Sequence, residues 1–311
     1  MRFIRYLSKG KERPGLLLDD SVIDLQRAFL ARQRFLGKTG ESRFPYKPGQ
    51  MFCAGEDAWK AARLALDFIL ERKAAGLEVP YGKQVFLAMD EVHFLPPVSR
   101  PGKLVCAGLN YPGLGEGHAR PAPQYPVLFH KAASALTGHN QPILIPRISK
   151  QIEYEGELTV VIGKRGKYIP REEAPAHIAG YTIANDVGAR DIQQRTSQWA
   201  SGKMFDTFCP LGPALVTRDE VPDPNALRIL TTLNHKVVQD GNTGEMLFDV
   251  CFLVSYISTL ATLEPGDMIL TGSPKRAGDR PDPRIFMQPG DTISIQIEKL
   301  GRLSNPVVAE E

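Results

Sequence analysis

From residue 104 onward, short apolar runs alternate with turn residues, and this pattern limits the possible folds more than any other feature of the chain. Such runs, bounded by Gly, Pro and Asn, are typical of strands. Helical candidates between them are few. The strand candidates are 104–107, 126–132, 142–146, 157–163, 180–186, 226–238, 267–273 and 291–297, and the helical ones are about 171–178, 188–197 and 249–263. This part of the chain is therefore predicted to be mainly β.

The N-terminal part has a mixed pattern. Residues 3–25 predict short strands around a turn, and 55–77 carry apolar residues at helical spacing and end near a glycine. A proline-rich stretch at 94–103 then separates this region from the first strand candidate of the β part. The predicted fold class is α+β, mainly β, with a small N-terminal α+β domain at 1–98 and a larger domain at 99–311.

Composition excludes several functional classes. The 311 residues include 38 basic and 35 acidic side chains, and a net charge of +3 is too balanced to indicate binding to nucleic acid or to a membrane surface. No stretch predicts a membrane span or a secretory signal. The cysteines have no C-x-x-C pair and fit buried thiols in a reducing compartment; they are Cys53, Cys106, Cys209 and Cys251. These features predict a cytoplasmic protein.

The stretch IEYEGELTVVIG at 152–163 places three glutamates at alternate positions, Glu153, Glu155 and Glu157. In a strand, alternate side chains project to one face, with Cα atoms about 6.6 Å apart, so neighbouring carboxylates can converge on one cation. Oxygen ligands suit Mg²⁺ or Mn²⁺. A third carboxylate from another strand end would leave positions open for water and substrate, and Asp186 is the best local candidate. The alternative is that the glutamates form the solvent-exposed face of an edge strand.

A polar cluster follows the strand candidate at 180–186. Arg190, Asp191, Gln193 and Gln194 come within about two helical turns of its end, and a lysine follows at 203. Active-site groups often lie where a rigid strand ends and a loop starts. The stretch from 183 to 213 is therefore a candidate site region.

At these residues, and from about residue 103 to 306, the sequence resembles the fumarylacetoacetate hydrolase family. The resemblance implies a twisted β-roll catalytic domain that holds the site, preceded by the small N-terminal domain, and it implies a homodimer. The matching segments are GLNY (108–111), PVLFHKAASALTGHNQPILIP (126–146), YEGELTVVIGKRGKYI (154–169), GYTIANDVGARDIQ (180–193), GKMFDTFCPLGPALVT (202–217), LEPGDMILTGSP (263–274) and PGDTISIQIEKLGRLSNPV (289–307).

The resemblance also implies roles for individual residues. Glu155, Glu157 and Asp186 match the family's ligands for a divalent cation, Mg²⁺ or Mn²⁺, with Ca²⁺ as a further candidate. Glu153 lies outside the family pair and is expected to be solvated, with a supporting role beside the metal ligands as the alternative. The resemblance further implies substrate-binding residues and a catalytic group: Tyr111, Arg190, Gln193 and Thr271 for substrate binding, and Lys203 as the catalytic group. For Arg190 and Lys203 the alternative is a surface salt bridge, and for Thr271 it is a structural role at a strand end.

The acid–base pair is where the sequence departs from the family. Members usually follow Asn-Tyr with two residues, then His, Ala, any residue and Glu, and this pair moves a proton. An alignment without gaps places Leu114 and Gly117 at these two positions. Either His118, helped by Glu116, takes over proton transfer, or the pair is missing and only the metal site remains, or a proton shuttle lies elsewhere. Among the other histidines, His130 is expected to border the site.

These features lead to two hypotheses about function. The first is a metal-dependent enzyme acting on a small 2-oxo or 1,3-diketo acid, with C–C bond hydrolysis of an acylpyruvate-like substrate as the leading reaction. Decarboxylation, hydration and tautomerisation are the alternatives on the same metal site, and the altered acid–base pair shifts weight towards reactions that need less from a general base. The second hypothesis is a catalytically weak relative that binds a metal and a dicarboxylate.

Overall fold

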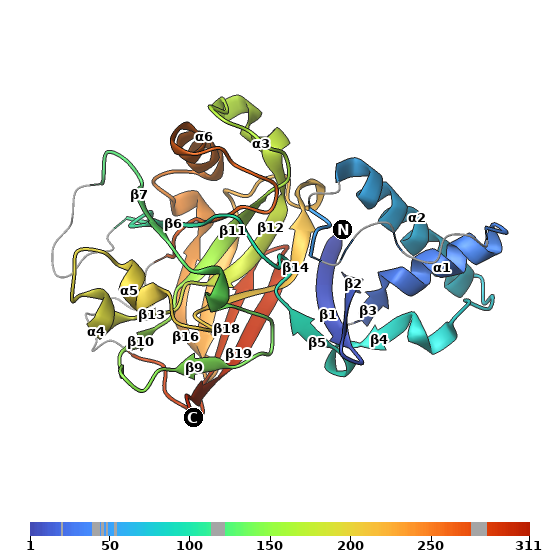
Figure 1. The fold of residues 1–311 in the computed structure, drawn as a ribbon, viewed down its shortest axis with the longest axis horizontal. Helices are drawn as coiled ribbons and strands as arrows, with labels where there is room; N and C mark the ends of the chain where they lie inside the picture. The colour runs from blue at the N-terminus through green and yellow to red at the C-terminus, as the bar shows by residue number, and fades with distance from the viewer. Residues whose placement is uncertain are drawn as a thin grey trace.

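The computed structural model describes residues 1–19, 21–38, 44, 47, 49–52, 55–112, 122–274 and 285–311. In Figure 1 the blue N-terminal strands and the two helices α1 and α2 lie beside a larger, strand-rich part that carries the C-terminus. The N-terminal elements are β1 (Arg2–Ser8), β2 (Lys11–Leu18), β3 (Ser21–Asp24), α1 (Leu25–Phe35), α2 (Gly55–Ala74), β4 (Phe86–Ala88) and β5 (His93–Leu95).

Asp24 joins the first three strands to the first helix. It is the last residue of β3 and the N-cap of α1, where its Oδ1 accepts a hydrogen bond from the Arg27 N–H at 2.8 Å. Its buried carboxylate also accepts from Tyr6 Oη at 2.7 Å and from Arg13 Nε at 2.6 Å. A single acid thus fixes β1, β2 and α1 relative to one another.

One long sheet runs through both parts of the molecule. Its strand order is β4-β3-β2-β1-β14-β12-β11-β17-β6-β7, and β1 pairs with β14 so that Phe3 lies opposite Leu215. Because this sheet crosses the predicted boundary between residues 98 and 99, the division into two domains stays a prediction. The larger part contributes β6 (Leu104–Gly108), β7 (Val127–His130), β8 (Leu136–Thr137), β11 (Gly156–Ile162), β12 (Ile178–Asn185), β14 (Cys209–Thr217) and β17 (Met268–Leu270).

A second sheet has the order β16-β15-β18-β19-β9, and a separate antiparallel pair joins β10 to β13. Four α-helices complete this part of the chain as the structure describes it. The strands are β9 (Ile143–Ile145), β10 (Ile152–Glu153), β13 (Gly188–Ala189), β15 (Arg228–Leu233), β16 (Lys236–Asn242), β18 (Thr292–Ile297) and β19 (Gly301–Ala309); the helices are α3 (Ala174–His177), α4 (Arg190–Gln193), α5 (Ala200–Lys203) and α6 (Val250–Leu260).

The strand β11 is central and contributes to two cores. Leu158, Val160 and Ile162 belong to the hydrophobic cluster that includes α6 and β18, whereas Val161 belongs to the other large cluster. The strand pairs with β12 on one side and β17 on the other, and all its residues are buried. The alternative of a solvent-exposed edge strand is therefore excluded, and Glu157, the second residue of β11, is 2% exposed.

The predicted α+β, mainly β class is confirmed, and some elements differ from their candidates. The long strands β14 and β19 were not predicted, because each contains proline, which removes a ladder donor and argues against a strand; the prolines are Pro210, Pro213 and Pro306. The candidate 226–238 is a hairpin, since Asn234 and His235 have φ of 50° and 70° and form the turn between β15 and β16.

The thiols follow the expected pattern. Cys106 and Cys209 are buried and free, Cys251 is half-buried, and Cys53 lies outside the described residues. Among the described helices, none combines the length and the apolar character that crossing a bilayer requires.

Candidate metal centre

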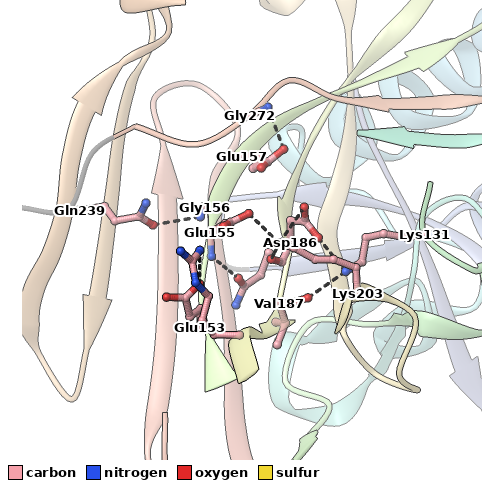
Figure 2. Close-up of polar contacts among 12 residues, drawn as sticks. Lys131, Glu153, Glu155, Gly156, Glu157, Asp186, Val187, Lys203, Gln239 and Gly272 are labelled. Carbon is pink, nitrogen blue, oxygen red and sulfur yellow. Dashed lines mark hydrogen bonds and ion pairs between the residues drawn. The ribbon is translucent and has the colours of Figure 1, made fainter. Parts of the chain in front are cut away.

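Three acidic side chains meet where the start of β11 lies beside the end of β12. The strands are antiparallel, with Gly156 opposite Asn185, so Glu155, Glu157 and Asp186 lie at the same end of the sheet. The Asp186 N–H donates to the Glu155 carbonyl oxygen at 2.8 Å, and Asn185 Oδ1 accepts from the Glu155 N–H at 2.9 Å. One carboxylate oxygen from each acid lies within 4.8 Å of the other two. The pairing thus brings the predicted ligand set together (Figure 2).

The three glutamates do not lie on one continuous strand. β10 ends at Glu153 and β11 starts at Gly156, so the chain breaks its strand geometry around Glu155. The prediction that Glu153 is solvated is wrong. The residue is 3% exposed, and its Oε2 lies 3.6 Å from Arg190 Nη1. β10 pairs with β13, which ends just before Arg190, and this pairing places the guanidinium beside the acid.

The backbone near Gly272 encloses Glu157. Glu157 Oε2 accepts a hydrogen bond from the Gly272 N–H at 2.9 Å. Gly272 has φ +91°, and a Cβ there would lie 2.8 Å from the Ala107 carbonyl oxygen, so only glycine allows this approach. The preceding Thr271 donates its hydroxyl hydrogen to the Leu158 carbonyl at 2.9 Å. Because the Thr271 hydroxyl donates its hydrogen to the backbone of β11, the hydroxyl oxygen can act only as an acceptor toward a ligand.

Two buried lysines balance the charge of the acids. Lys203 Nζ donates to Glu155 Oε2 at 2.7 Å and to the Asp186 carbonyl at 2.8 Å, and it lies 3.1 Å from Asp186 Oδ2. Lys131 Nζ donates to Asp186 Oδ1 at 2.7 Å and to the Val187 carbonyl at 2.9 Å. Their side chains are 1% and 0% exposed, so the alternative of a surface salt bridge is excluded for Lys203.

Lys131 was not predicted as a site residue, although its position carries a signal. It is a charged residue at the end of the apolar strand candidate 126–132, next to His130, which was expected to border the site. His130 is exposed, and the alternation along β7 directs Phe129 and Lys131 to the opposite face. Lys203 Nζ lies 5.8 Å from the centre of the Phe129 ring. A lysine that follows an apolar strand needs a partner if it is buried, and this requirement could have identified it.

Burial and mutual charge shift the titration of these groups in different directions. Burial raises the pKa of Glu157 well above its ordinary value, and Asp186 and Glu155 raise it further. Burial also raises the pKa of Glu155, against the opposing effect of Lys203. For Asp186 burial acts the same way, but Lys131 and Lys203 outweigh it and lower the pKa. Burial disfavours the charged form of Lys203, yet Asp186 and Glu155 raise its pKa, so its amine stays protonated.

The donor set fits a hard divalent cation. It consists of carboxylate oxygens alone, which suit Mg²⁺, Mn²⁺ or Ca²⁺. Asp186 Oδ2 is buried and already lies 3.1 Å from a positive charge, the Lys203 ammonium, so this oxygen is placed to interact with a cation. The Glu155 side chain is 31% exposed, so the cluster has an open side there. Glu155, Glu157 and Asp186 could therefore hold a cation that remains accessible to a ligand.

Without divalent cations, Glu157 is expected to make the protein less stable as the pH rises above about 5. The folded state keeps a proton on Glu157 that the unfolded state releases near 4.5, so unfolding releases protons and higher pH favours it. Asp186 acts with the opposite sign, but below 3.8. Burial lowers the pKa of His139 to about 4, so this residue makes the protein more stable as the pH rises from about 4 to 6.5. Calorimetry in EDTA should therefore compare the parent with Glu157→Gln, which shares the histidine; equal pH slopes would contradict the expectation.

Two predicted substrate residues carry buried polar atoms without a partner. Tyr111 Oη and Gln193 Oε1 form no hydrogen bond with the described residues. Tyr111 is 2% exposed and Gln193 is 7% exposed. Burial, with Glu157 and Glu245 adding to it, raises the pKa of Tyr111, so its hydroxyl remains a donor. The proposed acid–base residues His118 and Glu116 lie outside the described residues.

Sequence comparison places the chain among known proteins. A profile described as "Fumarylacetoacetate (FAA) hydrolase C-terminal" matches residues 103–308. The Bos taurus protein "Oxaloacetate tautomerase FAHD2A, mitochondrial" is 46% identical over 239 residues, which are 76% of this chain and 74% of the relative. The Xenopus laevis protein "Oxaloacetate tautomerase fahd2, mitochondrial" is 38% identical over 314 residues, 99% of this chain and 90% of the relative.

Solved structures share the whole fold. A fumarylacetoacetate hydrolase from Exiguobacterium antarcticum has a TM-score of 0.74 at 31% identity, with 100% of both chains covered. A maleylpyruvate hydrolase from Sphingobium sp. SYK-6, solved in complex with manganese(II) and pyruvate, has a TM-score of 0.74 at 26% identity, again over 100% of both chains. The likeness therefore extends from the strand-rich part to the N-terminal elements.

Proposed function

Because this chain belongs to the fumarylacetoacetate hydrolase family, we propose that it is a divalent-metal-dependent enzyme that interconverts the enol and keto forms of a small 2-oxo dicarboxylate such as oxaloacetate. The cluster of Glu155, Glu157 and Asp186 carries this proposal, because a buried set of oxygen donors with an open side suits metal-assisted chemistry on a 2-oxo acid. Mg²⁺ or Mn²⁺ is the proposed cation, with Ca²⁺ as a further candidate.

Tautomerisation takes precedence over the hydrolysis that the sequence alone favoured. Relatives that are 46% and 38% identical to the chain are named oxaloacetate tautomerases. Moving a proton between oxygen and carbon also needs no activated water, which agrees with the altered acid–base pair in the sequence. C–C bond hydrolysis of an acylpyruvate-like acid is the second candidate, supported by the maleylpyruvate hydrolase that was solved with manganese(II) and pyruvate.

The residues of the site have separate tasks in this proposal. A divalent cation held by the three acids supplies Lewis-acid stabilisation for the negative charge that develops on a substrate 2-oxo group. Lys203 stays protonated, so it acts as a buried hydrogen-bond donor and positive charge rather than as a base. Arg190, held by Glu153, offers its planar fork to a substrate carboxylate. Tyr111 and Gln193 offer their unpaired polar atoms to the same ligand, and Thr271 offers the lone pairs of its hydroxyl.

The proton carrier in this proposal is His118, helped by Glu116. The proton leaves the enol hydroxyl and one is added to the neighbouring carbon, so the reaction has no net change in protonation. Loss of turnover in His118→Ala supports this assignment. Unchanged turnover would mean that a different group moves the proton, while the metal-site proposal would stand.

The test is an assay of the purified chain with Mn²⁺ or Mg²⁺ on two substrates. Loss of the enol absorbance of oxaloacetate, without release of pyruvate, supports the tautomerase. Cleavage of an acylpyruvate to pyruvate and a carboxylic acid supports the hydrolase, and pyruvate and CO₂ from oxaloacetate indicate a decarboxylase. Tight Mn²⁺ binding without any turnover indicates the catalytically weak, dicarboxylate-binding relative and contradicts the proposed activity.

Gly188→Ala is expected to reduce kcat by about 3- to 10-fold without unfolding the protein. A Cβ at this position would lie 3.0 Å from Lys203 Cε and 3.1 Å from Gln193 Oε1, so both side chains must shift by a few tenths of an ångström. A displacement of about 1 Å in an active site can cost about 100-fold in rate. Steady-state kinetics beside a thermal melt measure the effect, and an unchanged kcat would contradict the placement of these two side chains at the reacting groups.

Three further expectations from the sequence stay proposals. The homodimer is tested by light scattering of the purified chain. The cytoplasmic location is tested by fractionation of cells, with mitochondria as the alternative because the vertebrate relatives are named mitochondrial. The domain division at residues 98 and 99 is tested by limited proteolysis.

A further inference from the structure

Lys131 occupies a position that no predicted role explains. It follows β7, and its backbone N–H donates to the Leu104 carbonyl at 3.2 Å, which fixes the start of the side chain against β6. Its side chain is 0% exposed. Lysine is almost never fully buried unless it is paired, because an isolated ammonium loses its hydration there. The partners of Lys131 therefore explain why this residue is tolerated in the core.

Lys131 and Lys203 bind different oxygens of Asp186. Lys131 Nζ donates to Oδ1 at 2.7 Å and to the Val187 carbonyl at 2.9 Å. The second oxygen, Oδ2, forms an ion pair at 3.1 Å with Lys203 Nζ, which also donates to Glu155 Oε2 at 2.7 Å. Figure 2 shows Lys131 approaching Asp186 from the side away from Glu155 and Glu157. Lys131 thus holds Oδ1, while Oδ2 lies on the side of Lys203 and Glu155.

We propose that Lys131 is a positioning residue that fixes Asp186 as a one-oxygen ligand, with Oδ1 tied to the lysine and Oδ2 presented to the cation. This inference rests on the proposed metal-dependent function. The anchor is rigid, because Val187 is the residue after Asp186 and its carbonyl binds the same ammonium. Lys131 therefore holds the backbone and the side chain of the ligand segment together, which sets the rotamer of Asp186 before a cation arrives.

An alternative role for Lys131 makes the opposite prediction. If the lysine only offsets the negative charge of the acids, its removal eliminates a repulsive positive charge beside a cation, and divalent binding should become tighter. If the lysine positions Asp186, its removal frees the carboxylate to rotate, and binding should weaken. Loss of an outer hydrogen-bond partner of a metal ligand typically costs about 10- to 100-fold in affinity. The direction of the change in affinity therefore separates the two roles.

The experiment is calorimetric titration of the full chain with Mn²⁺, comparing the parent with Lys131→Met, which keeps length and apolar bulk but removes the hydrogen bonds. We expect about 10- to 100-fold weaker binding in the variant. Lys103→Met is the matched control: Lys103 Nζ forms an ion pair at 2.6 Å with Asp267, which is 1% exposed and lies beyond the other end of β11. That variant should lose stability and keep the affinity of the parent for Mn²⁺.

Two results would overturn this role of Lys131. One is equal or tighter Mn²⁺ binding by Lys131→Met when the parent binds the ion. The other, which needs no variant to fold, is a crystal structure of the Mn²⁺-loaded parent in which Asp186 binds through both oxygens or through Oδ1. Failure of the parent itself to bind Mn²⁺ would overturn the metal-dependent function and this inference with it.

Discussion

Replacing Glu157 by glutamine should abolish divalent binding and turnover while making the metal-free protein more stable. Glu157 is 2% exposed, and burial followed by the charges of Asp186 and Glu155 raises its pKa well above the ordinary value. The amide removes this unfavourable buried charge and can still accept the hydrogen bond from the Gly272 N–H. Single stabilising substitutions commonly contribute about 0.5–2 kcal/mol, often at the cost of function. Loss of a direct anionic ligand should cost more affinity than the roughly 10- to 100-fold of an outer partner.

Calorimetry supplies both measurements for Glu157→Gln, a melt in EDTA and a titration with Mn²⁺. Glu264→Gln is the control, because Glu264 pairs with Arg165 at 2.9 Å on the surface, where the pair contributes little. The control should match the parent in both experiments. If Glu157→Gln binds Mn²⁺ like the parent, the three acids are not the metal site. If it is less stable than the parent in EDTA, the charge of Glu157 is not the destabilising element inferred from its burial.

Replacing Lys203 by methionine should lower kcat by about 10²–10³-fold, the usual cost of removing one preorganised donor from a charge-stabilising site. The same variant should bind Mn²⁺ more tightly than the parent, because the lysine amine competes for Glu155 Oε2 at 2.7 Å and lies 3.1 Å from Asp186 Oδ2. Its metal-free form should lose about 3–5 kcal/mol of stability, as expected when one partner of a buried ion pair is removed. Added Mn²⁺ should restore part of this loss.

The opposite effects expected for the two lysines make the pair informative. Lys131→Met should weaken Mn²⁺ binding, whereas Lys203→Met should strengthen it and reduce turnover. Lys167→Met is the control for a surface lysine, since Lys167 Nζ donates to the exposed Thr259 carbonyl at 2.9 Å. An unchanged kcat in Lys203→Met would remove this residue from the proposed catalytic groups, whatever its effect on metal affinity.

The candidate metal ligands could be predicted from the sequence because their signal is local. Glu155 and Glu157 are two residues apart, a spacing that allows them to share one cation, and the family resemblance makes this the favoured interpretation. Asp186 ends an apolar run that is typical of a strand, so its position at a strand end can be predicted from the sequence. The role of Glu153 could not be predicted, because its neighbour Arg190 comes close only through the pairing of β10 with β13. Lys131 was overlooked for the same reason, since its partner Asp186 is 55 residues away in the chain.

The strand-rich class could be predicted from side-chain period and residue type within short windows. The three candidate oxygen donors were predicted from the glutamate spacing together with the family resemblance. The tertiary structure decided which charges meet. The antiparallel register of β11 and β12 brings Glu155 beside Asp186, and Lys131, which follows β7, contacts the same Asp186 carboxylate. Such contacts depend on long-range pairing of strands, which local periodicity does not encode. The physical reason is that a buried charge is stable only where distant segments supply its partner.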